Sequence, residues 1–227
     1  MMALRLVLLL MLSLVLSSCA TQKPLNDYSD FYTHPPRSIL VVPVMNESVQ
    51  IVAPKMLVTT TAYPLGERGY YVFPTMLTEA LLLDLGLPDA GLIHQLPPME
   101  FYNRFGADAV LFITIEQWSS KYIVLNNTID LQARYVLVDT RTGDRLWERT
   151  QRLRHSSGGS GLIEMAINAA IDKIAAESFD AKYRPLAKQL NHRVFTTPNF
   201  GLPAGPYHPG HGKDSTNYPV AQAKPTP

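Results

Sequence analysis

Apolar residues in the first half of the chain gather in short continuous runs bounded by polar turn residues. Ile39–Val44 and Ala109–Ile115 are two such runs. Runs of this length predict strands that are buried on both faces of a sheet, as parallel strands are. Pro43 indicates that the hydrogen-bonded ladder of the first strand stops near its end. We expect Ala109–Ile115 to lie at the centre of the sheet.

A helix is predicted between the first strand and a short aromatic strand, Tyr70–Phe73. Ala53 and Pro54 suit a helix start, since proline is tolerated in the first turn. The stretch as far as Arg68 is an awkward helix, because it holds three consecutive threonines and Pro64. The connection of roughly 25 residues is long enough for a right-handed crossover between parallel strands. We therefore favour strand–helix–strand over a hairpin here.

Two further helices are predicted before the second long strand. Pro74 can open a helix over Thr75–Leu85, which is rich in helix formers and is closed by a glycine. Residues 86–98 are expected to form a loop. Met99–Phe105 is predicted to be a short helix capped by Gly106.

Beyond the second long strand the pattern changes to strict alternation. From Thr128 to Val138, apolar residues alternate with polar ones, a period that predicts an antiparallel strand with one buried face. Asn126-Asn127 is expected to form the turn that joins it to Tyr122–Leu125. After a turn at Arg141–Asp144, the strand Leu146–Arg154 is polar enough to predict an edge position.

The last third of the chain begins with a flexible link, Ser156–Gly161. It leads to Leu162–Phe179, whose apolar stripe at helical spacing predicts the clearest helix of the chain. Residues 183–194 are expected to continue helically. Proline and glycine are frequent in residues 196–227, which we predict to be a disordered tail or a segment draped over the surface.

These elements predict an α/β fold with a mixed sheet. A parallel strand–helix–strand first half is followed by antiparallel hairpins in the second half. Residues 38–195 are expected to form a single domain of ordinary size.

The N-terminal residues predict export and lipid attachment. Arg5 precedes the apolar run Leu6–Leu16, which is typical of a signal peptide over residues 1–18. This run is too short for a bilayer crossing, which needs about 20 apolar residues. The run ends in Leu-Ser-Ser before Cys19, which resembles the bacterial lipobox, where the cysteine is acylated and becomes the new N-terminus. We expect residues 19–37 to be a lipidated tether, although an ordinary secreted protein with a chance cysteine is the alternative.

Charge and cysteine content exclude further classes. Removal of residues 1–18 takes away Arg5, so the 20 Lys and Arg fall to 19 and match the 19 Asp and Glu. A neutral mature chain lacks the clustered basic excess typical of nucleic-acid binding. Acylation of Cys19, the only cysteine, leaves neither a disulfide nor a thiol nucleophile. Ala20 in place of aspartate, by resemblance to enterobacterial lipoproteins, favours the outer membrane, and we expect the domain on its periplasmic face.

No catalytic motif is found in the sequence. Gly158–Gly161 is not a nucleophile elbow, because residue 162 is leucine, and phosphate-binding and dinucleotide motifs are missing. Only His208 and His211 among the six histidines are close in sequence, which is too few ligands for a metal site. We therefore predict no catalytic residue, no metal and no cofactor.

Tyrosines supply the candidate partner-binding residues. Tyr63, Tyr70 and Tyr71 are chosen because tyrosine is enriched in binding hot spots. The alternative for such residues is an ordinary place in the core. The polar edge strand also permits a homodimer.

Several segments together resemble an uncharacterised family of bacterial lipoproteins, typified by a genome-derived neisserial vaccine antigen. The segments that carry the resemblance are Pro36–Pro43 with Asn46–Ser48, Tyr63–Pro74, Phe105–Ala109, Leu137–Asp139 with Thr142-Gly143 and Leu146-Trp147, and Gly205-Pro206. The resemblance implies an α/β domain similar to the amino-terminal domain of TolB, and to domains of CsgG-like lipoproteins. It also implies an association with other envelope lipoproteins of the CsgG-like kind.

Three functions remain open from the sequence. We favour an outer-membrane-anchored lipoprotein that acts without catalysis, as a binding or assembly component of a cell-envelope or secretion complex. The alternative is an envelope hydrolase or a small-ligand-binding lipoprotein, which would need a deep pocket with convergent polar groups. A surface-exposed antigen is the third.

Overall fold

A mixed sheet forms the centre of the molecule, and helices cover both of its faces. The computed structural model describes residues 27–123, 126–156 and 179–218. The elements, in chain order, are α2 (Ser29–Thr33), β1 (Ser38–Val41), β2 (Met45–Asn46), α3 (Ala53–Glu67), β3 (Tyr71–Val72), α4 (Thr75–Asp84), α5 (Ala90–Ile93), α6 (Pro98–Phe105), β4 (Ala109–Ile123), β5 (Asn126–Asp139), β6 (Arg145–Ser156), α8 (Phe179–Thr196) and the 3₁₀ turn η1 (Ser215–Asn217).

The strand order is β3-β1-β4-β5-β6. β1 pairs in parallel with both β3 and β4, and β2 adds a second short parallel pairing to β4. β4, β5 and β6 are antiparallel. The predicted mixed sheet is therefore confirmed, with the crossover through α3, the central β4 and the edge strand β6.

β4 is about twice as long as the sequence predicted. It runs on to Ile123, and its register shifts between Ile115 and Gln117. This bulge inserts one residue, so that Trp118 is buried beyond it and the simple alternation of the sequence is broken. The predicted turn at Asn126-Asn127 is wrong, because both residues pair within β5 and oppose the end of β4.

Two smaller differences concern helices. The predicted loop 86–98 contains α5, whose first turn is capped by the Asp89 carboxylate accepting from the Leu92 amide. α3 continues through Pro64, and the hydroxyls of Thr60 and Thr61 bond back to carbonyls one turn earlier. The predicted helix Leu162–Phe179 lies outside the described residues up to its last position, where α8 begins.

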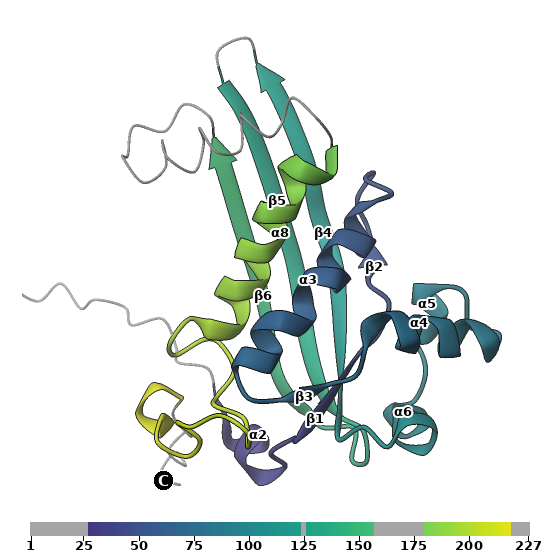
Figure 1. The fold of residues 1–227 in the computed structure, drawn as a ribbon, viewed down its shortest axis with the longest axis vertical. Coiled ribbons are helices and arrows are strands. Elements are labelled where there is room, and N and C mark those ends of the chain that lie inside the picture. Colours follow the sequence, from purple (N-terminus) through teal and green to yellow (C-terminus); the bar gives the residue numbers. More distant parts are fainter. Residues whose placement is uncertain (1–26, 124–125, 157–178, 219–227) are drawn as a thin grey trace, which may run out of the picture.

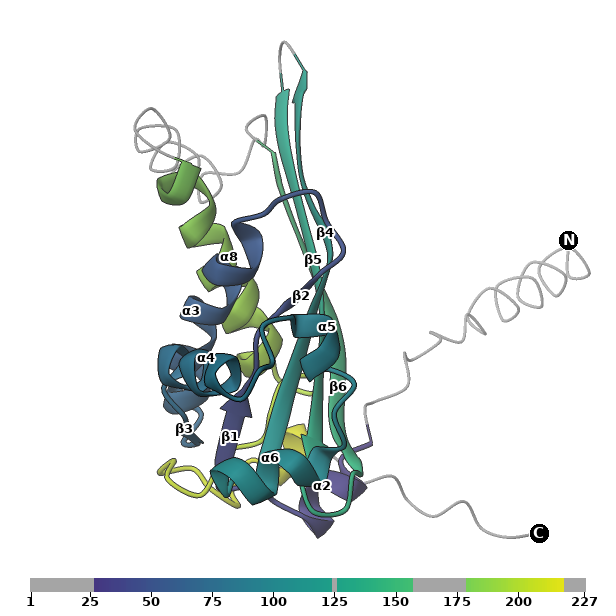
Figure 2. The same ribbon diagram turned by 90° about the vertical axis from the view of Figure 1, so that its right-hand side faces the viewer.

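Each face of the sheet has its own core. α3 and α8 lie side by side over β4, β5 and β6, and their apolar side chains join the larger cluster (Figures 1 and 2). Leu82 of α4, Ile93 of α5 and Phe101 of α6 form the smaller cluster with the other side of β1 and β4. Among the described helices, none has the length and apolar character that a bilayer crossing requires.

The tether predicted over residues 19–37 is wrong for its second half. Tyr28 and Phe31 are buried in the larger core, and the Tyr28 hydroxyl donates to the carbonyl of Gly201 at 2.7 Å. α2 packs against β6. The folded domain therefore begins near residue 28, because these aromatic side chains close one end of the core.

Of the two alternatives predicted for residues 196–227, disorder is wrong as far as residue 218, because the segment lies over the domain. Leu202 and Tyr218 are buried, and the Tyr70 hydroxyl donates to the carbonyl of Pro203 at 2.7 Å. Arg68 at the end of α3 donates to the carbonyl of Leu202 and pairs with Asp214 at 3.0 Å. Side chains of the domain hold the segment largely through its backbone carbonyls. Such contacts leave no apolar pattern in the sequence, so composition alone predicted disorder.

Candidate functional site

α4 exposes an apolar stripe to solvent. Pro74 precedes its first residue, and its buried side is formed by Thr78 and Leu82. The opposite side carries Met76 and Leu83, with 69% and 58% of their surface exposed. Ala80 lies between them, at the i, i+4, i+7 spacing of a helix face that packs against another element.

Further leucines of the same helix are exposed. They are Leu77 at 56% exposure, which extends the stripe, Leu81, and Leu85 just after the end of α4. Single exposed leucines are normal, whereas several on one helix indicate an interaction surface. We call Met76, Leu77, Ala80 and Leu83 the α4 stripe.

The surroundings of the α4 stripe are acidic. Asp84 lies one helical turn beyond Ala80, and Glu79 borders Leu83 on the other side. Residues 69–103 contain four acidic side chains and neither lysine nor arginine. The stripe is thus an apolar surface with a negative border.

A groove between α3 and α8 has the opposite charge. It has a volume of about 450 Å³ and is lined by Thr59, Thr60, Tyr63 and Pro64 of α3 and by Arg184, Lys188 and His192 of α8. The three residues of α8 follow each other at intervals of four, so they form one row along the helix. We call this hollow the α3–α8 groove.

A second hollow of about 320 Å³ continues the groove towards the start of α3. It shares Thr59 and Arg184 with the first and adds Lys55. Ile51, which is 90% exposed, and Val52 border it as apolar side chains of the loop before α3. The groove therefore joins a basic row to an exposed apolar loop.

A buried hydrogen-bond network fixes the two helices that form the groove. The side-chain amide nitrogen of Asn191 donates to the Leu57 carbonyl at 3.0 Å and to the Thr60 hydroxyl at 2.8 Å. Its oxygen accepts from the Tyr135 hydroxyl at 2.7 Å, and burial raises the pKa of that phenol. α3, α8 and β5 are thereby held in one arrangement, and the groove is preformed.

The three predicted tyrosines occupy different environments. Tyr63 is 71% exposed in the α3–α8 groove, where its hydroxyl donates to Glu67 at 2.6 Å and this bond raises its pKa. Tyr71 is half exposed on the edge strand β3 and contacts Phe73 edge to face. Tyr70 is buried, so its prediction as a partner-binding residue is wrong; it holds the C-terminal segment instead.

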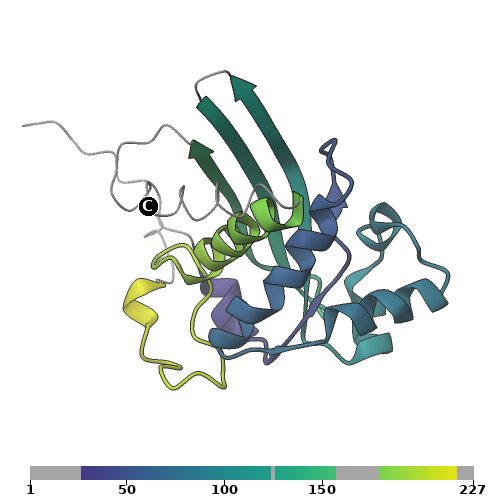
Figure 3. The same cartoon turned by 45° about the horizontal axis from the view of Figure 1, so that its top comes forward.

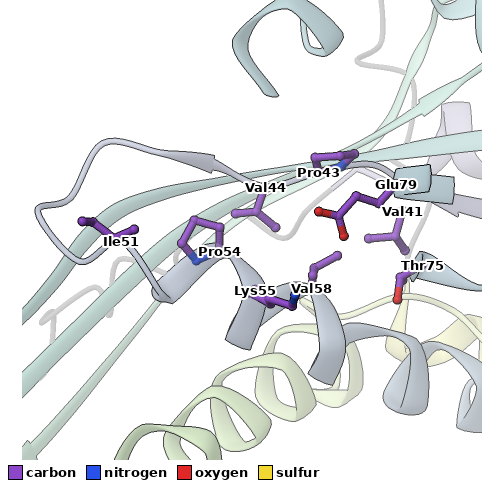
Figure 4. Close-up of a pocket in the computed structure, with 9 residues that line it drawn as sticks. All are labelled: Val41, Pro43, Val44, Ile51, Pro54, Lys55, Val58, Thr75 and Glu79. Carbon is purple, nitrogen blue, oxygen red and sulfur yellow. The ribbon is translucent and has the colours of Figure 1, made fainter. Parts of the chain in front are cut away.

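A smaller hollow of about 150 Å³ lies between β1, α3 and α4 (Figure 4). Val41, Val44 and Val58 make it mostly apolar, and the Glu79 side chain extends into it from α4. In the part of the chain that the structure describes, no three His, Cys, Asp or Glu side chains are placed to hold a metal ion. Cys19 lies outside the described residues, and its predicted lipidation stays a prediction.

Comparison with protein families identifies the family of this chain. The family described as "Putative lipoprotein GNA1162-like" matches residues 26–207. The chain belongs to this family. The lipoprotein family predicted from the sequence is confirmed.

Two relatives of GNA1162-like type show how far the similarity extends. "Putative lipoprotein NMB1124/NMB1162" of Neisseria meningitidis serogroup B is 38% identical over 174 residues, which cover 75% of this chain and 81% of the relative. The crystal structure of lipoprotein GNA1162 from Neisseria meningitidis superposes with a TM-score of 0.53 at 38% identity. It covers 63% of this chain and 100% of the neisserial one. The mixed α/β fold is therefore that of GNA1162.

A more distant structure is the PelC dodecamer from Paraburkholderia phytofirmans. It is 16% identical, has a TM-score of 0.44 and covers 76% of this chain and 92% of the PelC chain. Because the identity and the TM-score are this low, no property of PelC is assigned to this protein. The likeness to the TolB amino-terminal domain stays a prediction.

Sequence reasoning missed the α4 stripe and the basic row of α8. The signal for the stripe is present, because Thr75–Leu85 has apolar residues on every side and lacks the polar face of a surface helix. The signal for the row is the four-residue spacing of Arg184, Lys188 and His192. Neither could be placed on the surface before the fold was known.

Proposed function

We propose that this GNA1162-like lipoprotein is held at the periplasmic face of the outer membrane through acylated Cys19. There it acts without catalysis, as a binding component of a cell-envelope complex. Membership of a lipoprotein family supports the anchored location. The α4 stripe is the observation that carries the binding role, because exposed apolar side chains at helix-packing spacing are typical of a docking surface.

The chemistry around the stripe favours a protein partner over a lipid surface. An interfacial helix that binds anionic lipid has lysines and arginines beside its apolar side chains. α4 instead has Glu79 and Asp84 there, within a stretch that lacks basic residues. An apolar partner surface with a basic border fits this arrangement.

Site-specific crosslinking in native membranes tests the proposal. A photo-reactive residue at Leu77 of the intact lipoprotein should give discrete protein adducts. Met76→Glu with Leu83→Glu should abolish them, because two carboxylates then face the apolar partner surface. Thr150→Glu on the edge strand is the control, since it adds a charge to an exposed position away from α4.

The adducts at Leu77 can also contradict the proposal. Adducts that are unchanged in the doubly substituted stripe, with the protein still folded and in the membrane fraction, would show that α4 is not the docking surface. If no protein adduct forms at Leu77 in the first place, the binding role itself is lost.

A further inference from the structure

We propose that the partner of the α4 stripe is the α3–α8 groove of a second copy of this chain. This inference rests on the proposed binding function and names the partner. The two surfaces match in spacing and in charge. α8 and α4 lie on opposite sides of α3 (Figure 3), and the groove lies between α3 and α8, so one copy cannot place its own α4 in its own groove.

The spacing of the two surfaces allows a helix to pack in the groove. Met76 and Ala80 define a ridge at intervals of four residues along α4. Thr59 and Tyr63 on one wall, and Arg184 and Lys188 on the other, repeat at the same interval. Ridges of i±4 spacing interdigitate between helices, and this is the commonest class of helix packing. The aliphatic stems of arginine and lysine supply apolar contact for such a ridge.

The charges of the two surfaces are complementary. Arg184 and Lys188 line the groove, and Asp84 borders the α4 stripe on its exposed side. Within the described ranges, none of these three side chains takes part in an ion pair. A second copy brings the two sets together, and opposite charges around an apolar contact favour this register over others.

Having both surfaces on one chain also allows a closed pair. Two copies related by a two-fold axis would each present α4 to the groove of the other, so the contact would be made twice in a closed pair. The stripe of one copy comprises only four residues, whereas a standard interface has about 20–30 residues per partner. The reciprocal contact doubles the area, and confinement to one membrane raises the effective concentration of the two copies.

Charge reversal tests this pairing in the intact, membrane-bound lipoprotein. A photo-reactive residue at Ala80 should give an adduct of twice the chain mass, with the crosslink mapped to α3 or α8 of the other copy. A groove-reversed variant (Arg184→Glu with Lys188→Glu) and a helix-reversed variant (Asp84→Lys) should each reduce that adduct by about tenfold or more, since like charges then face each other.

Restoring the adduct distinguishes a lost contact from a folding defect. Co-expression of the two variants should restore a mixed adduct, because each contact then pairs opposite charges again. A chain that carries both reversals should restore its own adduct. Arg193→Glu with Lys213→Glu, two exposed cations outside the groove, is the control and should leave the adduct unchanged.

Three results would overturn the pairing. They are a wild-type adduct that contains only other proteins, a homotypic adduct that survives both reversals, and a failure of co-expression to restore it. The first of these leaves the proposed binding function standing and removes only the second copy as its partner.

Discussion

Asn191 is the residue that connects the layers beneath the groove. It is fully buried on α8, yet its amide bonds to α3 and accepts from Tyr135 of β5. An unsatisfied polar group at such a site costs more than the bond contributes, so the network specifies one packing of the two helices. The shape of the groove therefore depends on the buried side chain of Asn191, which does not line the groove.

Asn191→Leu should lower the free energy of unfolding by about 1–3 kcal/mol, because it leaves the Tyr135 hydroxyl buried without its acceptor. Urea denaturation measures the loss. Tyr135→Phe provides the second arm of a double-mutant cycle, and the double variant should be more stable than the sum of the single losses predicts. Strictly additive losses would show that the bond between the two side chains contributes nothing.

The carboxylate of Asp130 on β5 makes the free energy of unfolding depend on pH. Hydrogen bonds from Arg152, and then from Arg154, hold the pKa of its carboxyl below the ordinary value, with N–O distances of 3.0 and 2.9 Å. A folded-state pKa that lies below the unfolded one stabilises the fold at pH values above about 3.9, and this stabilisation is lost as the pH falls through the folded value.

The melting temperature of Asp130→Asn compared with wild type tests this. At neutral pH the variant should melt lower, because two guanidinium groups lose their charged partner. Towards pH 3 the two melting curves should converge, since the wild-type carboxyl is then increasingly protonated. A difference that stays constant between pH 7 and pH 3 would contradict the assignment.

At the scale of elements, the C-terminal segment stabilises the domain although its only regular element, as far as residue 218, is the short 3₁₀ turn η1. Gly69 shows how closely it is bound: its φ is +79°, and a Cβ there would lie 2.3 Å from the backbone nitrogen of His208. The Trp147 indole donates to the Phe200 carbonyl at 3.0 Å. Side chains of the domain thus reach the backbone of the segment, and this gives it a fixed path.

Two truncations of the C-terminus test whether this segment stabilises the core. Removal of residues 198–227 should lower the melting temperature by several degrees or abolish soluble expression, because Tyr28, Tyr70 and Trp147 lose their acceptors and become exposed. Removal of residues 219–227 alone is the control and should leave the melting temperature unchanged. Equal stability of the two truncated proteins would show that the segment contributes nothing to the core.

Sequence patterns predicted the elements whose signal is local. β1, α4, α6 and the alternating β5 follow from apolar runs, helix formers and period-two alternation within one segment. The bulge in β4, the continuation of α3 through Pro64 and the ordered C-terminal segment depend on contacts between residues far apart in the chain. Tyr70 and Tyr71 are neighbours of the same residue type, and only the fold shows that one is core and the other is surface.

At the scale of the whole molecule, the proposed lipid anchor affects how the α4 stripe and the α3–α8 groove of two copies meet. The described domain begins at Asp27, eight residues after Cys19, a distance that an extended chain spans in at most about 29 Å. If Cys19 is acylated as proposed, a domain on so short a tether would stay close to the leaflet and would meet other copies at high effective concentration. A contact of modest area would then be sufficient for the proposed pairing in the membrane, although it would dissociate in dilute solution.

Cys19→Ala should therefore do two things at once: move the protein out of the membrane fraction, and reduce the homotypic Ala80 adduct, although both docking surfaces are unchanged. Replacement of residues 1–19 by an unrelated transmembrane helix should restore the adduct, because membrane confinement is what the acyl chains provide. Fractionation and the yield of the adduct measure the two effects. A soluble Cys19→Ala protein that crosslinks as well as wild type would show that pairing does not need the membrane, and a Cys19→Ala protein that stays in the membrane would remove the lipid anchor.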